Sequence, residues 1–162
     1  MVENDLDNSQ RSYNHFANFN LKLGTYNIHG QGSKNNVKLR KIKNTFNRSK
    51  FDILFLQETR TTGDEKELKR WQKVFNSKQI FLTEHGADSV GAGIVIKDEQ
   101  VFSVQRSFKD PRGRYVGVVG DHEEGQFLLL NFYSPSVDAQ IRDFVVQEIN
   151  SALESLGENF LF

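Results

Sequence analysis

Short apolar runs of β-strand type alternate along this chain with stretches in which apolar residues recur at helical spacing. Residues 21–26 alternate apolar and polar positions, and residues 51–56 form an almost continuous apolar run typical of a buried strand. Between and after them, residues 36–47 and 64–76 place apolar side chains on one helical face. The first half of the chain therefore predicts strand, helix, strand, helix.

The second half begins with strands separated by turn-forming Gly, Asp and Lys-Asp-Glu segments. A long helix then follows, with Ser136 as its N-cap and Gly157 as its C-cap, and another strand starts within 159–162. The complete order predicts an α/β layered domain with mixed sheets. We expect the central strands at 79–83, 92–97, 101–107, 114–119 and 126–133.

Composition limits the class of protein. At 162 residues, with 37% hydrophobic and 26% charged residues, the chain has the size and balance of one ordinary globular domain. It contains no apolar run of 18 residues, so we expect no membrane span, and the polar residues 1–20 predict a disordered arm rather than a secretory signal. The chain has no cysteine, which excludes disulfides, thiolate metal sites and a cysteine nucleophile. These features fit an intracellular protein.

Charge is balanced overall but unevenly distributed. The formal net charge is zero, yet residues 34–50 contain seven basic residues and no acidic one. This stretch is most simply the solvated face of an amphipathic helix. A patch that follows a nucleic-acid backbone and a nuclear-import-like cluster are the two alternatives.

Three polar residues follow strand-like runs, at positions where sheets commonly carry their chemistry. Glu58 comes directly after the buried run, where a carboxylate is costly unless it is paired or bound to a metal such as Mg²⁺. Asn27 and Tyr133 occupy equivalent positions. Taken singly, each has a simpler explanation: Glu58 as a surface acid or partner of Arg60, Asn27 as a turn former, and Tyr133 as an aromatic cover on the core.

Together, these residues resemble the motifs of the endonuclease/exonuclease/phosphatase superfamily. Within it, the chain is most similar to exonuclease III and to the apurinic-type endonuclease domains of non-LTR retrotransposons. The similarity covers residues 21–162. The matching segments are Tyr26-Asn27-Ile28-His29-Gly30, Leu56-Gln57-Glu58-Thr59, Gly91-Ala92-Gly93-Ile94, Gly113-Arg114-Tyr115 and Asn131-Phe132-Tyr133-Ser134-Pro135.

The resemblance implies a DNase-I-like four-layer α/β sandwich, with mixed sheets inside and helices outside. It implies that Glu58 holds Mg²⁺ or Mn²⁺, and that Asn27 and Tyr133 are catalytic residues that hydrogen-bond the phosphate. Arg114 and Asn131 are the expected phosphate or DNA contacts. The implied activity is metal-dependent hydrolysis of DNA phosphodiesters by an endonuclease associated with a reverse transcriptase, which would place the protein in the nucleus.

Other family motifs are missing from the 162 residues. Relatives continue with Gly-Asp-Phe-Asn and later Ser-Asp-His, which would follow Phe162, and the role of His29 is open. We therefore expect residues 21–162 to form a truncated domain and an incomplete sandwich, with negligible nicking activity alone. We also expect an exposed inner sheet face that promotes self-association. A superfamily phosphatase or phosphodiesterase with a non-DNA substrate, and a non-catalytic relic, are the alternative functions.

Overall fold

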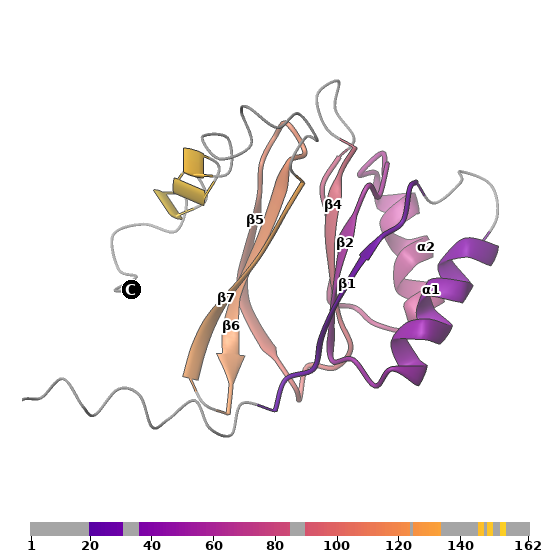
Figure 1. The fold of residues 1–162 in the computed structure, drawn as a ribbon, viewed down its shortest axis with the longest axis horizontal. Coiled ribbons are helices and arrows are strands. Elements are labelled where there is room, and N and C mark those ends of the chain that lie inside the picture. The colour runs from indigo at the N-terminus through magenta and orange to yellow at the C-terminus, as the bar shows by residue number, and fades with distance from the viewer. Residues whose placement is uncertain are drawn as a thin grey trace, which may run out of the picture.

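Two β-sheets pack face to face, and two helices cover the outer face of the first sheet (Figure 1). This computed structural model describes residues 20–30, 36–84, 90–123 and 125–133, together with six helical positions between 146 and 154. The elements are β1 (Leu23–Asn27), α1 (Val37–Arg48), β2 (Ile53–Gln57), α2 (Glu65–Phe75), β3 (Ile80–Leu82), β4 (Ala92–Ile96), β5 (Ser103–Lys109), β6 (Tyr115–His122) and β7 (Gly125–Phe132).

The first sheet has the strand order β1-β2-β4-β3. β1 and β2 are parallel, while β4 is antiparallel to both β2 and β3. Because β1 and β2 are parallel and in register from Leu23 opposite Ile53 to Asn27 opposite Gln57, their carboxyl ends lie at one edge of the sheet. The residues that follow the two strands therefore meet at this edge, which is uppermost in Figure 1.

The two helices pack on the first sheet through apolar stripes that their sequences predict. Leu39, Ile42 and Phe46 of α1 are buried, while the basic residues between them face outward. On α2, the Trp71 and Phe75 rings stack with centroids 5.7 Å apart. These side chains form one apolar core with the outward-facing residues of the sheet.

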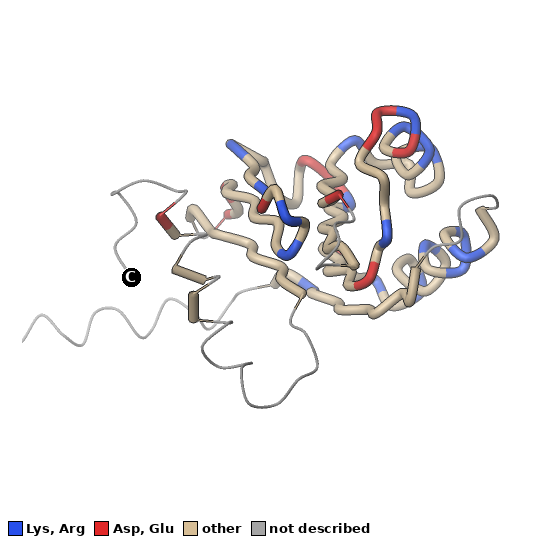
Figure 2. Tube along the Cα trace, turned by 90° about the horizontal axis from the view of Figure 1, so that it is seen from above, with Lys and Arg blue, Asp and Glu red and all other residues tan. Residues whose placement is uncertain are grey.

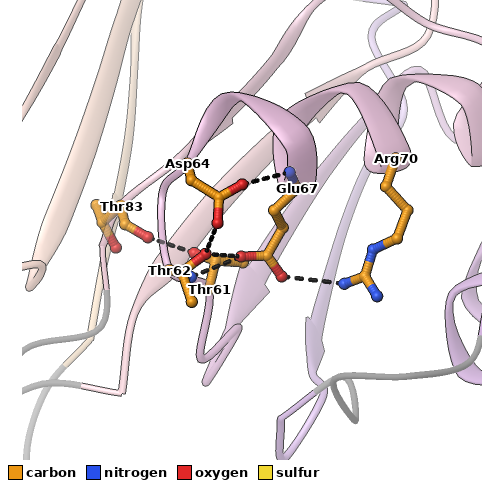
Figure 3. A network of polar contacts seen from close by, with 6 residues as sticks. All are labelled: Thr61, Thr62, Asp64, Glu67, Arg70 and Thr83. Carbon is orange, nitrogen blue, oxygen red and sulfur yellow. Dashed lines mark hydrogen bonds and ion pairs between the residues drawn. The ribbon is translucent and has the colours of Figure 1, made fainter.

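A polar network fixes the start of α2 (Figure 3). The Asp64 carboxylate caps the helix by accepting the Glu67 backbone N–H at 2.7 Å. The Glu67 carboxylate accepts hydrogen bonds from the backbone N–H and hydroxyl of Thr62, and it pairs with Arg70 at 3.0 Å. The segment that leads from β2 into α2 is thereby held in place. This segment directly follows the candidate site described below.

The second sheet, with the order β5-β6-β7, covers the inner face of the first. Ile94 and Ile96 of β4 and Val118 of β6 are fully buried between the sheets. The inner face that we expected to be exposed is covered over β2 and β4 by the three antiparallel strands, whereas Leu23 of β1, which lies level with Ile53, remains 46% exposed. Self-association through the part of this face that remains exposed stays a prediction.

From β1 to β7, the order of elements predicted from the sequence is confirmed, with boundary shifts of a few residues. The largest shifts are in the second sheet. β5 starts at Ser103 rather than 101, because the Asp98 carboxylate and carbonyl accept the backbone N–H groups of Gln100 and Phe102 in a turn. No described helix is long and apolar enough to cross a membrane. The arm at 1–19, the caps Ser136 and Gly157 and the strand at 159–162 lie outside the described residues.

Candidate active site

Asn27 and Glu58 meet where β1 and β2 end. The Asn27 side-chain amide donates a hydrogen bond to Glu58 Oε1 at 2.8 Å. The strand register explains this contact: Asn27 lies opposite Gln57, so Glu58 is the first residue beyond the pair. Two residues that are 31 positions apart in the chain therefore form one polar pair at the edge of the first sheet.

The orientation of the Asn27 side chain is fixed from both of its ends. While Nδ2 donates to Glu58, Oδ1 accepts the backbone N–H of His29 at 3.0 Å. The backbone beyond the strands is also joined, since Gly30 N–H donates to the Glu58 carbonyl at 2.7 Å. The amide therefore cannot rotate without losing two hydrogen bonds, which keeps its donor on the carboxylate.

Two cationic or ionisable side chains flank the second oxygen of Glu58. His29 Nδ1 lies 3.4 Å and Arg60 Nη2 lies 3.6 Å from Oε2, and the Glu58 side chain is only 16% exposed. The Asn27 hydrogen bond, followed by His29 and Arg60, lowers the pKa of Glu58 against the opposing effect of partial desolvation. Glu58 is therefore held as a carboxylate at neutral pH.

The backbone of this edge adopts uncommon conformations. Five described residues other than glycine have positive φ. Asn76 directly follows α2 and Lys50 lies two residues after the end of α1, where the left-handed conformation is ordinary. The other three are His29 (φ 46°), Glu58 (φ 54°) and Arg60 (φ 48°). Such strain clusters at functional sites, and these three residues surround one carboxylate.

A glycine allows the next segment to pack behind the site. Thr59 and Arg60 donate backbone hydrogen bonds to the carbonyls of Gly91 and Val90, which precede β4. Gly91 has φ +85°, and a Cβ atom there would lie 2.5 Å from Thr59 Oγ1. Only glycine satisfies both conditions, which allows the two backbone segments to approach closely.

Asn131 connects the two sheets beneath the site. Its side-chain amide donates to the carbonyls of Leu56 at 2.9 Å and Gly93 at 2.8 Å, and its Oδ1 accepts from Gln57 at 3.0 Å. The residue is 4% exposed. These contacts give Asn131 a structural role in place of the expected phosphate contact, because every group that could bind a phosphate already has a partner.

Arg114 is likewise engaged within the fold. Its Nε donates to Asp110 Oδ2 at 2.9 Å, and the two side chains are only 10% and 4% exposed. The expected role of Arg114 as a phosphate contact stays a prediction. The Arg114 carbonyl does contribute to the site region by accepting the backbone N–H of Tyr133 at 2.7 Å.

Tyr133 lies at the same edge as the Asn27–Glu58 pair. Tyr133 directly follows β7 and lies two residues after Asn131, so strand alternation points both side chains to the same face. Asn131 contacts Leu56 and Gln57 near the carboxyl end of β2. No described hydrogen bond joins the tyrosine hydroxyl to Asn27 or Glu58. Of the three expected catalytic residues, two are in contact and the third lies at the same edge.

The donor set at this edge fits a hard divalent cation. Mg²⁺ is commonly held by one or two carboxylates, with water and phosphate oxygens completing its shell. Glu58 supplies one ionised, oriented carboxylate. Among the described residues there is no cluster of three His, Cys, Asp or Glu side chains, so an all-protein cage is not built from these segments.

The sequence reasoning missed two supporting residues. Gln57 bonds Thr25 and Asn131, and Arg60 faces the carboxylate at 3.6 Å. Strand alternation offers a signal for Gln57, because its side chain must point to the opposite face from that of its neighbour Leu56. Arg60 was considered only as an ordinary surface partner of Glu58.

Several solved structures share the fold of this chain, at 14% to 16% sequence identity. No family model matches the sequence. The endonuclease domain of TRAS1, a telomere-specific non-LTR retrotransposon, superposes with a TM-score of 0.53 at 14% identity, covering 82% of this chain and 54% of that domain. AP endonuclease LMAP from Leishmania major gives 0.55 at 16% identity, with 83% and 47% coverage.

TDP2 from D. rerio, solved with a single-strand DNA product, is a third similar structure. Its TM-score is 0.55 at 16% identity, and the match covers 86% of this chain and 56% of that protein. The chain thus spans about half the length of each of these three structures. At these identities, the likeness establishes the DNase-I-like α/β sandwich that the motifs implied.

Proposed function

We propose that this chain forms the metal-binding half of a phosphodiester hydrolase that acts on DNA, of the retroelement endonuclease type. The contact between Asn27 and Glu58 at the carboxyl edge of a DNase-I-like sheet carries the proposal. An ionised, oriented carboxylate beside an amide and an arginine suits the binding of a cation together with a phosphate.

Each residue has a distinct part in this function. Glu58 would hold Mg²⁺ or Mn²⁺, and that ion, when bound, would offset the negative charge that develops on the phosphodiester. Asn27 fixes the carboxylate, leaving Oε2 directed towards His29 and Arg60. Arg60, whose side chain is 53% exposed, is placed to contact a phosphate oxygen. Tyr133 would donate its hydroxyl to another phosphate oxygen.

Two-dimensional NMR of the labelled chain, titrated with Mg²⁺ and with Mn²⁺, tests the metal site. We expect shifts or paramagnetic broadening centred on Asn27, Glu58 and Arg60, and tighter metal binding when a short DNA duplex is present. Glu58→Gln should abolish these effects, because the amide is neutral. Glu99→Gln, which changes an exposed acid in the turn before β5, is the matched control.

Plasmid nicking supplies the second measurement. Any nicking by the purified chain must require the divalent cation and must disappear in Glu58→Gln. Nicking that survives this substitution, or metal-induced shifts that centre elsewhere, would overturn the proposal. Metal binding at Glu58 without affinity for DNA would instead favour a phosphatase or phosphodiesterase with another substrate.

A further inference from the structure

A groove between the two helices is lined by basic residues and contains no acid. It has a volume of about 380 Å³ and lies on the outer layer of the molecule, where α1 and α2 adjoin. We name it the α1–α2 groove. Its lining residues are Asn36, Arg40, Lys43, Asn44, Lys73 and Val74.

The charges of this groove are not neutralised within the fold. Arg40, Lys43 and Lys73 form no ion pair with any residue in the described segments. The acids of α2 are occupied elsewhere, since Glu65 pairs with Lys69 at 2.7 Å and Glu67 pairs with Arg70. Figure 2 marks the Lys and Arg positions of the two helices in blue. Three cations and two neutral amides therefore line one hollow, and no described residue supplies a counter-charge to it.

We propose that the α1–α2 groove binds the phosphate backbone of duplex DNA, as a contact region separate from the Glu58 edge. Arg40 and Lys43 are three residues apart on one helix, so their side chains start about 5–6 Å apart and can reach neighbouring phosphates. Lys73 approaches from the other helix. Asn36 and Asn44 add neutral hydrogen-bond donors, which suit phosphate oxygens.

The apolar residues of α1 argue against an anionic membrane as the partner. A helix that binds a membrane surface presents bulky apolar side chains to the lipid. Here Leu39, Ile42 and Phe46 are buried against the sheet, and Val37 is the exposed apolar residue of α1. The outer surface of the helix is thus polar and basic, as required for hydrated phosphates.

The neighbouring hollow does not share this character. It begins at Lys43 and includes Lys78 and Lys97, but Asp98 and Glu99 also line it. The acids offset the cations there, so a polyanion gains little from this surface. The proposal is therefore confined to the α1–α2 groove.

Binding of a fluorescent DNA duplex, measured in EDTA at several salt concentrations, tests the proposal. The groove variant is Arg40→Gln/Lys43→Gln/Lys73→Gln. Its control, Lys41→Gln/Arg48→Gln/Lys66→Gln, removes one Arg and two Lys from exposed positions of the same helices outside the groove. Because three phosphate contacts are lost, we expect the groove variant to bind about tenfold more weakly or worse, with a salt slope lower by about 2–3.

The control should lose less than about threefold in affinity, because its residues contribute only to the general field. Equal losses in the two variants, or no loss in the groove variant, would overturn the proposal. So would groove-dependent binding to phosphatidylserine vesicles without binding to DNA. A charge-conserving variant, Arg40→Lys/Lys43→Arg/Lys73→Arg, must retain binding. If it loses as much as the Gln variant, the effect is structural and the proposal fails.

EDTA makes this test independent of the proposed hydrolase function. EDTA removes the divalent cation, so the Glu58 edge contributes no metal-mediated phosphate contact, and no cleavage is measured. If the chain binds DNA through the α1–α2 groove but binds no metal, the proposed hydrolase function is refuted and the groove proposal is supported. The reverse result would refute the groove alone.

Discussion

The Gln57 side-chain amide donates a hydrogen bond to Asn131 Oδ1 at 3.0 Å, across the interface between the two sheets. Gln57 directly precedes Glu58, so this contact ties the strand that carries the carboxylate to the second sheet. Asn131 adds two further bonds to the carbonyls of Leu56 and Gly93. The position of the site therefore depends on the buried side-chain amide of Asn131, which belongs to the second sheet.

Replacement of Asn131 by Ala should destabilise the whole fold. It leaves the Leu56 and Gly93 carbonyls and the Gln57 amide without a bond that each now has, which costs about 2–4 kcal/mol of unfolding free energy in total. Urea unfolding followed by circular dichroism measures the change. Gln126→Ala, at an exposed position of the same strand, should change the unfolding free energy by less than about 0.5 kcal/mol. Similar unfolding free energies for the two variants would contradict the role of Asn131 in joining the two sheets.

Replacement of Asn27 by Ala should raise the pKa of Glu58. The Asn27 hydrogen bond is the largest cause of the lowered pKa, so its loss allows partial desolvation to count for more. NMR titration of the Glu58 side-chain carboxyl carbon measures the shift. Asn44→Ala, on the exposed face of α1, should leave the pKa of Glu58 where it is. An unchanged value in Asn27→Ala would show that the hydrogen bond is absent in solution.

The lowered pKa also fixes the direction of a pH effect on stability. A carboxyl whose pKa is lower in the folded state stabilises the fold above its ordinary value of 4.5. This contribution disappears as the pH falls through the folded pKa. The difference in melting temperature between the wild type and Glu58→Gln should therefore shrink progressively below pH 4.5. A difference that grows on acidification would contradict this assignment.

Replacement of Gly91 by Ala should destabilise the fold and weaken metal binding. The positive φ alone costs about 1–3 kcal/mol, and the new Cβ must displace Thr59 next to Glu58. Gly125→Ala is the matched control, because its φ is +134° but no atom lies within 4 Å of the added Cβ. Both variants should have a lower melting temperature than the wild type, while only Gly91→Ala should lower the affinity for Mn²⁺ in a binding titration. Equal affinities would exclude the clash as a disturbance of the site.

Replacement of Asp64 by Ala should lower the melting temperature, because α2 loses its N-cap. The Thr62 hydroxyl and then the Glu67 backbone N–H lower the pKa of Asp64 below its ordinary 3.8, so the charged cap stabilises the fold above that value. The loss should thus be largest at neutral pH and should fade as the pH falls through the folded pKa. Asp64→Asn keeps a capping oxygen and should retain more of the stability than Asp64→Ala. Thermal melts from neutral to acid pH check both statements.

The order of strands and helices was determined by the sequence alone. Helical spacing placed Leu39, Ile42 and Phe46 on a buried face, and apolar runs located the buried strands within a few residues. The positions of Asn27 and Glu58 at strand ends were also visible, because each follows an apolar strand-like run. All of these features are local, since periodicity depends only on residues a few positions apart.

Only the tertiary structure decided which side chains bind one another and which remain available. Asn131 and Arg114 belong to motifs of the expected active site, yet the structure buries both in contacts within the fold. Conversely, the basic face of α1 became a groove only when Lys73 of α2 joined it. The physical reason is that hydrogen-bond partners and counter-charges can come from residues far along the chain. Leu56, which accepts a hydrogen bond from Asn131, lies 75 positions away from it, and no local sequence pattern predicts such a contact.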